Sequence, residues 1–252
     1  MLTLTPLPGL PLVQTGDDLA GLIRAGLDRA GLTLQDGDIL VIAQKIVSKA
    51  EGRLVRLADV TASEQALELA EITLKDARFV EVVLRESREV LRARPNTLIV
   101  EHRLGFVCAN AGVDRSNVEA PPGEEVLLCL PADPDGACAA LRSALGAAYG
   151  AAIGVIINDS HGRAWRMGTL GVAIGAAGVP ALLDLRGKPD LFDHALQITQ
   201  VGLADELAAA ASIVMGQADE GRPVVHIRGV PYTLREGTAQ ELYRPKSLDL
   251  FR

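Results

Sequence analysis

Apolar residues recur along the chain with two different spacings, and each spacing predicts a different kind of element. The apolar residues of 19–27 share one face of a helix, so we expect a helix that Asp17 or Asp18 caps and that ends at Gly31. Short unbroken apolar runs predict buried strands instead. The expected strands are 39–42, 97–100, 126–130, 155–157, 181–185 and 224–227.

Four further segments predict helices. Thr61 and Glu64 have the spacing of a capping box, which predicts that a helix opens there. Another helix is expected over 76–91, where alternating basic and acidic residues favour a solvated outer face. The alanine-rich segments 135–149 and 203–215 predict closely packed helices. Because strands and helices do not alternate strictly, the pattern favours an α+β fold.

Composition and charge narrow the range of functions. The chain has 252 residues, enough for one large domain or two small ones. Its formal net charge of -7 disfavours a polyanionic macromolecule as partner. Aromatic residues make up 3% of the chain, which disfavours a stacking platform for single-stranded nucleic acid. We therefore expect no nucleic acid partner, whereas a small anion held through metal ions fits the charge.

The cysteines and the N-terminal segment bear on the compartment. Cys108, Cys129 and Cys138 contain no C-x-x-C pair, so the pattern favours small buried thiols in a reducing compartment over a disulfide framework or a zinc site. Prolines interrupt the N-terminal segment, and it lacks the basic region of a signal peptide. No uncharged apolar run reaches membrane-spanning length. We expect a cytoplasmic protein with no membrane partner.

The most informative stretch is a buried strand followed by polar residues. The apolar run 155–157 predicts the strand, and the loop expected after it carries Asp159, Ser160, Arg163 and Arg166. A carboxylate, a hydroxyl and two guanidinium groups at the end of a rigid element suit a hard metal ion and a polyphosphate. Four glycines follow and allow close approach of backbone or of phosphate. They are Gly168, Gly171, Gly175 and Gly178.

Three other polar segments suit the same chemistry, and each also has an ordinary structural explanation. Asp114 and Asn117 are three residues apart in a loop, which suits Mg²⁺ or Mn²⁺ but also fits Asx turns. Lys49 lies just after a strand, where it can neutralise a phosphate or simply face solvent. Gly216 lies where a helix would end, as a C-cap before a polar connection. Neither a P-loop nor a G-x-G-x-x-G motif is present.

Eight short motifs, taken in their order along the chain, resemble the coenzyme F420-0:L-glutamate ligase family, and they span essentially the whole chain. No single motif is decisive, but together they are highly specific. The motifs are Gly9-Leu10-Pro11, Gly16-Asp17-Asp18-Leu19, Ser48-Lys49-Ala50-Glu51-Gly52-Arg53, Asn110-Ala111-Gly112-Val113-Asp114-x-x-Asn117, Asp133-Pro134-Asp135-Gly136, Asp159-Ser160-His161-Gly162-Arg163, Gly171-Val172-Ala173-Ile174-Gly175 and Met215-Gly216-Gln217. The resemblance implies the stand-alone ligase, without the nitroreductase-like C-terminal extension of mycobacterial relatives.

The resemblance implies formation of an amide that depends on GTP and on metal ions. GTP would phosphorylate the lactyl carboxylate of coenzyme F420-0 to an acyl phosphate, and the α-amine of L-glutamate would then displace phosphate. The resemblance also implies that further glutamates would be added through γ-linkages. Phosphoryl transfer needs positioning and charge neutralisation more than a covalent nucleophile. The expected ions are Mg²⁺ or Mn²⁺, two of which would clamp the attacking and leaving oxygens, together with K⁺.

The resemblance also assigns roles to individual residues. Asp114 and Asp159 would bind one metal ion, and Ser160 and Gln217 would help to bind a second. The expected catalytic residues are Asp159, Arg163 and Arg166, the two arginines as charge stabilisers by our own inference. The expected GTP contacts are Pro8, Gly9, Leu10, Pro11, Gln44, Lys49, Asn117, Met215, Gly216, Gln217 and Ala218. With the phosphates assigned to these groups, close packing of strand and helix becomes the better explanation of the four glycines.

The family fold implies mixed and antiparallel sheets with packed helices, in two interleaved subdomains of about 1–90 with 160–252 and about 91–159. It also implies a homodimer that shares a sheet. Two alternatives stay open. One is a sibling ligase that uses a dehydro or phosphoenolpyruvate-derived form of the acceptor. The other is a GTP-binding regulatory module without turnover, which would need fewer of these polar groups.

Overall fold

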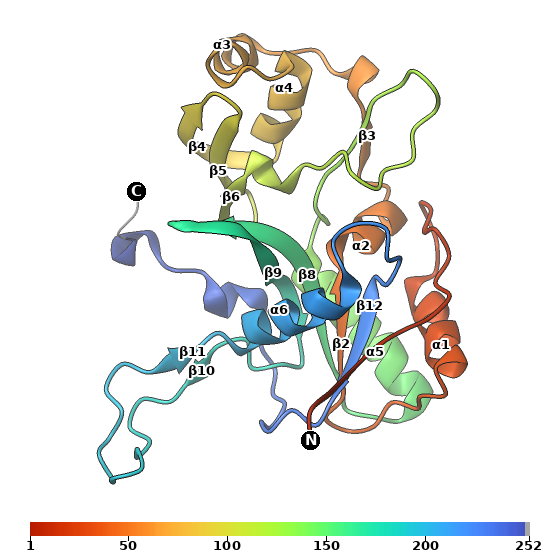
Figure 1. Ribbon diagram of the computed structural model, residues 1–252, viewed down its shortest axis with the longest axis vertical. Helices are drawn as coiled ribbons and strands as arrows, with labels where there is room; N and C mark the ends of the chain where they lie inside the picture. The colour runs from red at the N-terminus through yellow and green to blue at the C-terminus, as the bar shows by residue number, and fades with distance from the viewer. Residues whose placement is uncertain (250–252) are drawn as a thin grey trace.

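A computed structural model describes residues 1–249 of the protein, and its largest sheet, the central sheet, carries helices on both faces (Figure 1). Within the described residues its strand order is β1-β12-β2-β8-β9. These strands are β1 (Thr3–Pro6), β12 (Val224–Arg228), β2 (Ile39–Ala43), β8 (Gly154–Arg163) and β9 (Arg166–Ala177). The neighbours β2 and β8 are parallel, whereas the other neighbouring strands are antiparallel.

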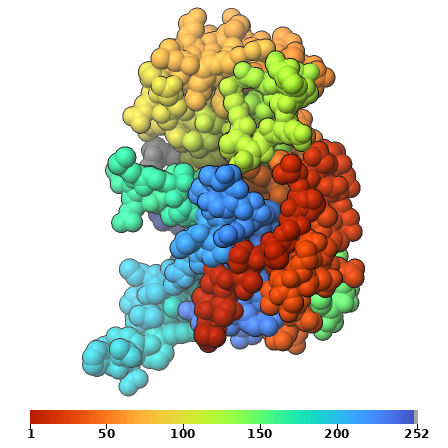
Figure 2. Space-filling view, turned by 45° about the vertical axis from the view of Figure 1, so that its right-hand side comes forward, coloured from red at the N-terminus to blue at the C-terminus, as the bar shows by residue number. Residues whose placement is uncertain are grey.

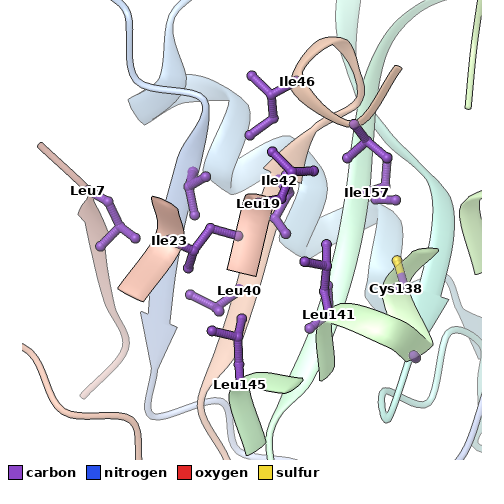
Figure 3. Packing of buried hydrophobic residues seen from close by; sticks show 14 of the residues in the cluster. Leu7, Leu19, Ile23, Leu40, Ile42, Ile46, Cys138, Leu141, Leu145 and Ile157 are labelled. Atoms are coloured by element: carbon purple, nitrogen blue, oxygen red, sulfur yellow. The ribbon is translucent and has the colours of Figure 1, made fainter. Parts of the chain in front are cut away.

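Alternate residues of β2 pack against different helices, because successive side chains of a strand point to opposite faces. Leu40 and Ile42 belong to the core shared with the first and fifth helices, and Figure 3 shows these side chains from close by. Ile39 and Val41 belong to the core under the sixth helix. The helices are α1 (Leu19–Arg29), α2 (Gln44–Ala50), α5 (Pro134–Tyr149) and α6 (Leu203–Met215).

A third hydrophobic core lies apart from the central sheet, in the upper part of Figure 1. Its main elements are α3 (Glu64–Thr73), α4 (Ala77–Arg85), β4 (Ser87–Arg94), β5 (Thr97–His102) and β6 (Val107–Ala109). Strands β3 (Leu54–Arg56) and β7 (Val126–Leu128) pair beside it, and β10 (Leu183–Asp184) and β11 (Gln200–Val201) form a separate excursion. Among residues 1–249, no helix is long and apolar enough to cross a membrane.

The predicted α+β fold with mixed and antiparallel sheets is confirmed. Helix α1 begins after Asp18, whose carboxylate accepts a hydrogen bond from the Gly21 amide at 3.1 Å, and Gly31 follows its end with φ +65°. The two alanine-rich helices are confirmed as α5 and α6. The proposed subdomain bounds and the shared sheet of a dimer stay predictions.

The helix predicted over 76–91 is wrong in its second half, because α4 ends at residue 85 and β4 follows. Glu86 lies at the turn between them, where its buried carboxylate contacts Arg53 at 2.8 Å and Arg103 at 3.1 Å. These partners come from remote parts of the chain. Local helical spacing therefore could not reveal where the helix ends.

The polar loop predicted after 155–157 is also wrong, because β8 continues as a strand to residue 163. It pairs with β9, which satisfies the backbone groups of the polar residues. A register shift between Ile157 and Asn158 marks where buried residues give way to polar ones. The side chains of Asp159 and Ser160 are therefore held on a paired strand rather than on a loop.

Smaller differences concern where elements begin and end. Helix α3 is capped by Ser63, whose hydroxyl accepts a hydrogen bond from the Ala66 amide at 3.3 Å, and not by Thr61. Within 181–185 only the two residues of β10 form a strand, and β7 is two residues shorter than the strand predicted over 126–130.

Glycines of β9 bring the strand close to the helices on both faces. A Cβ atom at Gly171 would lie 2.6 Å from the carbonyl oxygen of Ala208 in α6. A Cβ atom at Gly175 would lie 2.6 Å from the carbonyl oxygen of Pro134 in α5. Only a residue without a side chain permits both approaches. This geometry supports the packing explanation of these glycines.

Candidate active site

The parallel pair β2 and β8 brings separate polar segments to one edge of the central sheet. Ala43, the last residue of β2, is paired with Asn158 of β8. Helix α2 begins directly after Ala43, so its lysines start at this edge. On β8 the residues immediately after Asn158 are Asp159 and Ser160. The phosphate-binding and metal-binding residues predicted from remote parts of the sequence therefore meet here.

A cavity of about 780 Å³ opens at this edge. Five segments and Leu54 of β3 line it, and the segments come from the N-terminal stretch, α2, the loop after β6, β8 and the connection that follows α6. Figure 2 shows the N-terminal segment in red, the loop of residues 115–123 in lime and the connection after α6 in blue on one face of the molecule. The lining segments are 10–15, 43–49, 114–119, 158–160 and 215–223. We call this space the main cavity.

Hydrogen bonds connect the loop after β6 to the elements around it. The Lys49 ammonium donates to the Asn117 carbonyl oxygen at 2.7 Å. The Asn117 side-chain amide donates to the Ala218 carbonyl oxygen at 3.1 Å, in the connection after α6. Burial, and then the nearby ammonium of Lys45, lower the pKa of Lys49. An anion in the main cavity would therefore meet a partly desolvated lysine.

The connection after α6 is also tied to β8. The Ser160 hydroxyl donates to the Gln217 carbonyl oxygen Oε1 at 2.8 Å, and the Gln217 amide donates to the Ser212 hydroxyl at 2.8 Å. Gly216 ends α6 with φ +78°, and a Cβ atom there would collide with the carboxyl group of Glu220. The tight turn after α6 thus depends on glycine.

Asp114 is paired with a lysine that the sequence did not single out. The Lys45 ammonium lies 2.6 Å from a carboxylate oxygen of Asp114 and donates to the carbonyl and hydroxyl oxygens of Ser116. Burial alone would raise the pKa of Asp114, but hydrogen bonds from Lys45 and Ser116 hold this pKa below its ordinary value. Asp114 is therefore a carboxylate at neutral pH.

Asp159 faces a second cavity as well as the main one. Its carboxylate lies 2.9 Å from Nε2 of His161, and both side chains are 14% exposed. The second cavity has a volume of about 500 Å³ and shares Asp114, Asp159 and Ser160 with the main cavity. Two spaces large enough for substrates thus meet at the same three polar residues.

Most residues predicted for the site line the main cavity. Pro8 and Gly9 do not, but their carbonyl oxygens accept hydrogen bonds from Arg29 and so anchor the segment that follows. Arg163 lines the second cavity, and Arg166 lines neither. Those in the main cavity are Leu10, Pro11, Gln44, Lys49, Asp114, Asn117, Asp159, Ser160, Met215, Gly216, Gln217 and Ala218.

Sequence reasoning assigned no role to Lys45, and it included His161 in a motif without giving it a role in the site. Lys45 and Lys49 are four residues apart, a spacing that places both on one face of a helix, and this signal was available. His161 follows Asp159 by two residues, so an extended strand puts both side chains on one face. The expected loop concealed that relation.

The donor set at the junction of the cavities fits Mg²⁺ or Mn²⁺. Among the described residues, no group of three or more His, Cys, Asp or Glu side chains is arranged to hold a metal ion. The main cavity instead offers two carboxylates, a hydroxyl and an amide oxygen, from Asp114, Asp159, Ser160 and Gln217. Such a sparse oxygen set suits ions that keep several waters and bind substrate phosphates.

Comparison with known proteins gives the context of this site. The family model described as F420-0:Gamma-glutamyl ligase matches residues 9–229. A relative from Methanothermobacter thermautotrophicus named coenzyme F420:L-glutamate ligase is 48% identical over 253 residues, covering 100% of this chain and 99% of the relative. A relative of the same name from Methanopyrus kandleri is 49% identical over 255 residues, covering 100% and 98%. The chain therefore belongs to the F420-0:gamma-glutamyl ligase family.

Proposed function

We propose that the protein is a GTP-dependent ligase that joins the lactyl carboxylate of coenzyme F420-0 to the α-amine of L-glutamate. Family membership supports the acceptor and the amino acid, because the family description names F420-0 and the relatives are named for coenzyme F420 and L-glutamate. The observation that carries the proposal is the junction of two cavities at Asp114, Asp159 and Ser160. A ligase of this kind must bring a nucleotide phosphate and an acceptor carboxylate to one point.

In the proposed reaction, an oxygen of the acceptor carboxylate attacks the γ-phosphorus of GTP. The bond from that phosphorus to the β-phosphate oxygen breaks, so an acyl phosphate and GDP form. The glutamate nitrogen then attacks the acyl carbon, inorganic phosphate leaves and the nitrogen loses a proton. Repetition on the γ-carboxylate of the added residue would lengthen the chain by further glutamates.

The residues of the main cavity would bind and neutralise the nucleotide. The ammonium groups of Lys45 and Lys49 lie where they can offset phosphate charge, and Asn117 ties the loop to the connection after α6. Asp114, Asp159, Ser160 and Gln217 would hold the ions, and two Mg²⁺ or Mn²⁺ ions, aided by K⁺, would neutralise charge on the phosphoryl oxygens when bound. Holding the two reacting groups together at the junction lowers the entropic barrier.

A reconstituted assay tests this proposal. Purified protein is incubated with coenzyme F420-0, GTP, Mg²⁺ or Mn²⁺ and L-glutamate, and products are followed by mass spectrometry together with GDP release. Mass increments of one or more glutamates support the ligase. Products from only a dehydro form of the acceptor would support the sibling ligase, and GTP binding without product would support a regulatory module.

Asp159→Ala provides the matched test of the site. We expect this variant to lose turnover, because Asp159 belongs to both cavities, while its far-UV circular dichroism stays like that of the unchanged protein. Asp59→Ala serves as the control, because it removes an exposed carboxylate between β3 and α3. Full activity of Asp159→Ala would remove the junction from the mechanism.

We also propose that the ligase works as a cytoplasmic homodimer. Large apolar side chains are exposed where β8 turns into β9, because Trp165 in the turn is 81% exposed and Met167 at the start of β9 is 97% exposed. The excursion between β10 and β11 exposes Leu191 and Phe192, and it projects from the body of the molecule in Figure 1. Exposed apolar groups of this kind favour a protein interface. Light scattering that gives the mass of a monomer at assay concentrations would count against the dimer.

A further inference from the structure

His161 contacts Asp159 within a regular part of the pair formed by β8 and β9. Asp159 is paired with Val172 and His161 with Leu170, and the two register shifts of this pair lie outside that interval. Two residues along a strand span roughly 6.6 Å, and their side chains lie on one face. Because Nε2 of His161 lies 2.9 Å from Oδ2 of Asp159, the imidazole leans along β8 toward the carboxylate.

A chain of aromatic contacts holds the imidazole in this position. The ring of Phe106, between β5 and β6, lies 5.4 Å from the His161 ring between centroids, with 44° between their planes. Phe106 also stacks on His102 at 5.2 Å and meets Tyr243 edge-on at 5.6 Å. The Tyr243 hydroxyl donates to the Ile174 carbonyl oxygen of β9 at 3.3 Å. Packing of this kind restricts the rotation of the His161 ring.

The hydrogen bond from His161 engages one oxygen of Asp159 and leaves the other available. Because a carboxylate only accepts hydrogen bonds, Nε2 of His161 is the donor to Oδ2. Among residues 1–249, no group donates a hydrogen bond to Oδ1 of Asp159. His161 lines the second cavity and not the main one, so it holds the carboxylate from the side of the second cavity.

The position of His161 suits a group that orients a metal ligand rather than one that binds the ion. Its Nε2 atom is engaged by Asp159, and its ring does not line the main cavity, which the oxygen donors Ser160 and Gln217 line. Mg²⁺ and Mn²⁺ prefer oxygen ligands. Hydrogen bonds to such ligands set their direction, and losing one typically costs about 10–100-fold in metal affinity or activity.

We propose that His161 is a positioning residue that fixes the orientation of the Asp159 carboxylate toward the metal ion. This inference rests on the proposed function, because Asp159 is a metal ligand only in that proposal. The imidazole would act through Asp159 and would touch neither the nucleotide phosphates nor the reacting carboxylate. The site would therefore depend on a hydrogen-bond donor at the place of Nε2, and not on the shape of the ring.

Two variants separate the hydrogen bond from the packing of the ring. His161→Phe keeps an aromatic ring against Phe106 and removes the donor, whereas His161→Gln loses the ring and offers an amide donor at a similar reach. Electron paramagnetic resonance of free Mn²⁺ gives the affinity of each nucleotide-free protein. We expect the dissociation constant of Mn²⁺ to rise about tenfold or more in His161→Phe and less than about threefold in His161→Gln. Thermal unfolding shows whether each variant is folded.

Two further measurements respond to the orientation of Asp159 and not to packing alone. At saturating Mn²⁺, kcat of His161→Phe should fall about tenfold or more while the KM for GTP stays within about twofold, because His161 does not line the main cavity. Electron spin-echo spectra of Mn²⁺ on the nucleotide-free protein should show no directly coordinated nitrogen. Arg94→Met removes an exposed arginine of β4 that lines neither cavity, so this control should change none of these values.

Three results would overturn the inference. They are an unchanged Mn²⁺ affinity in His161→Phe, an equally weak affinity in folded His161→Gln, and a directly coordinated imidazole nitrogen. If His161→Phe does not fold, His161→Leu also lacks the donor and takes its place in each measurement. Mn²⁺ binding needs no turnover. If His161→Phe binds Mn²⁺ more weakly but the unchanged protein forms no amide, the proposed function fails while the positioning role of His161 stands.

Discussion

The ion pair between Lys45 and Asp114 predicts that Lys45 competes with divalent ions for the Asp114 carboxylate. A cation that binds Asp114 must displace the Lys45 ammonium, which lies 2.6 Å from the carboxylate. Lys45→Met removes the charge and keeps a side chain of comparable length. We therefore expect the nucleotide-free variant to bind Mn²⁺ more tightly than the unchanged protein does.

The burial of the pair sets the size of this effect. The side chains of Lys45 and Asp114 are 24% and 35% exposed, so the pair is neither fully screened nor fully desolvated. Exposed pairs contribute about 0.2–1 kcal/mol, whereas breaking a buried pair costs about 3–5 kcal/mol. We expect the loss of the ion pair to change the free energy of Mn²⁺ binding by about 1.4 kcal/mol, which lies between these limits and corresponds to roughly tenfold tighter binding.

Electron paramagnetic resonance of free Mn²⁺ during titration measures this affinity without nucleotide or turnover. Lys49→Met is the matched control, because the Lys49 ammonium donates to the Asn117 carbonyl oxygen and forms no ion pair with a carboxylate of residues 1–249. That control should leave the Mn²⁺ affinity nearly unchanged. An equal or weaker affinity in Lys45→Met would refute the view that Lys45 and a divalent ion compete for Asp114.

Two predictions concern stability. Asp38 is buried between His226 at 2.8 Å and Arg228 at 2.6 Å, so Asp38→Asn should lower the free energy of unfolding by about 3 kcal/mol in urea titrations at neutral pH. Burial raises the pKa of Asp38, but hydrogen bonds from Arg228 and His226 leave it below its ordinary value. The stabilisation is therefore present above the unfolded-state pKa and is lost as pH falls through the folded-state pKa. The difference in free energy of unfolding between the unchanged protein and Asp38→Asn should shrink below about pH 4. A difference that stays constant with pH would contradict this assignment. Gly171→Ala should lower the free energy of unfolding by about 1–3 kcal/mol, because the added methyl group overpacks against α6. The thermal midpoint in calorimetry should fall by several degrees, and an unchanged midpoint would mean that α6 can move away.

The sequence predicted the elements whose signals are local. Asp18 caps α1 directly before the apolar face of the helix begins, and the alanine-rich segments became α5 and α6. The buried apolar runs became β2, β8 and β12. In these segments the hydrophobic period, the cap and the burial all favour the same structure.

Elements that depend on distant partners could not be predicted in the same way. Helix α4 ends where Glu86 meets Arg53 and Arg103, and no local pattern contains those contacts. Polar residues after Ile157 predicted a loop, yet β9 supplies hydrogen bonds that keep them in a strand. The backbone hydrogen bonds of a strand come from the neighbouring strand, so polar side chains alone do not end a strand.

By itself, the sequence determined which residue types are available for phosphate and metal chemistry and placed them near the ends of predicted elements. Only the tertiary structure decided that the parallel strands β2 and β8 end side by side, so that Lys45, Asp114 and Asp159 line one cavity. It also decided that Arg163 belongs to a second cavity. The physical reason is that hydrophobic period and capping act over a few residues, whereas strand pairing joins segments more than a hundred residues apart.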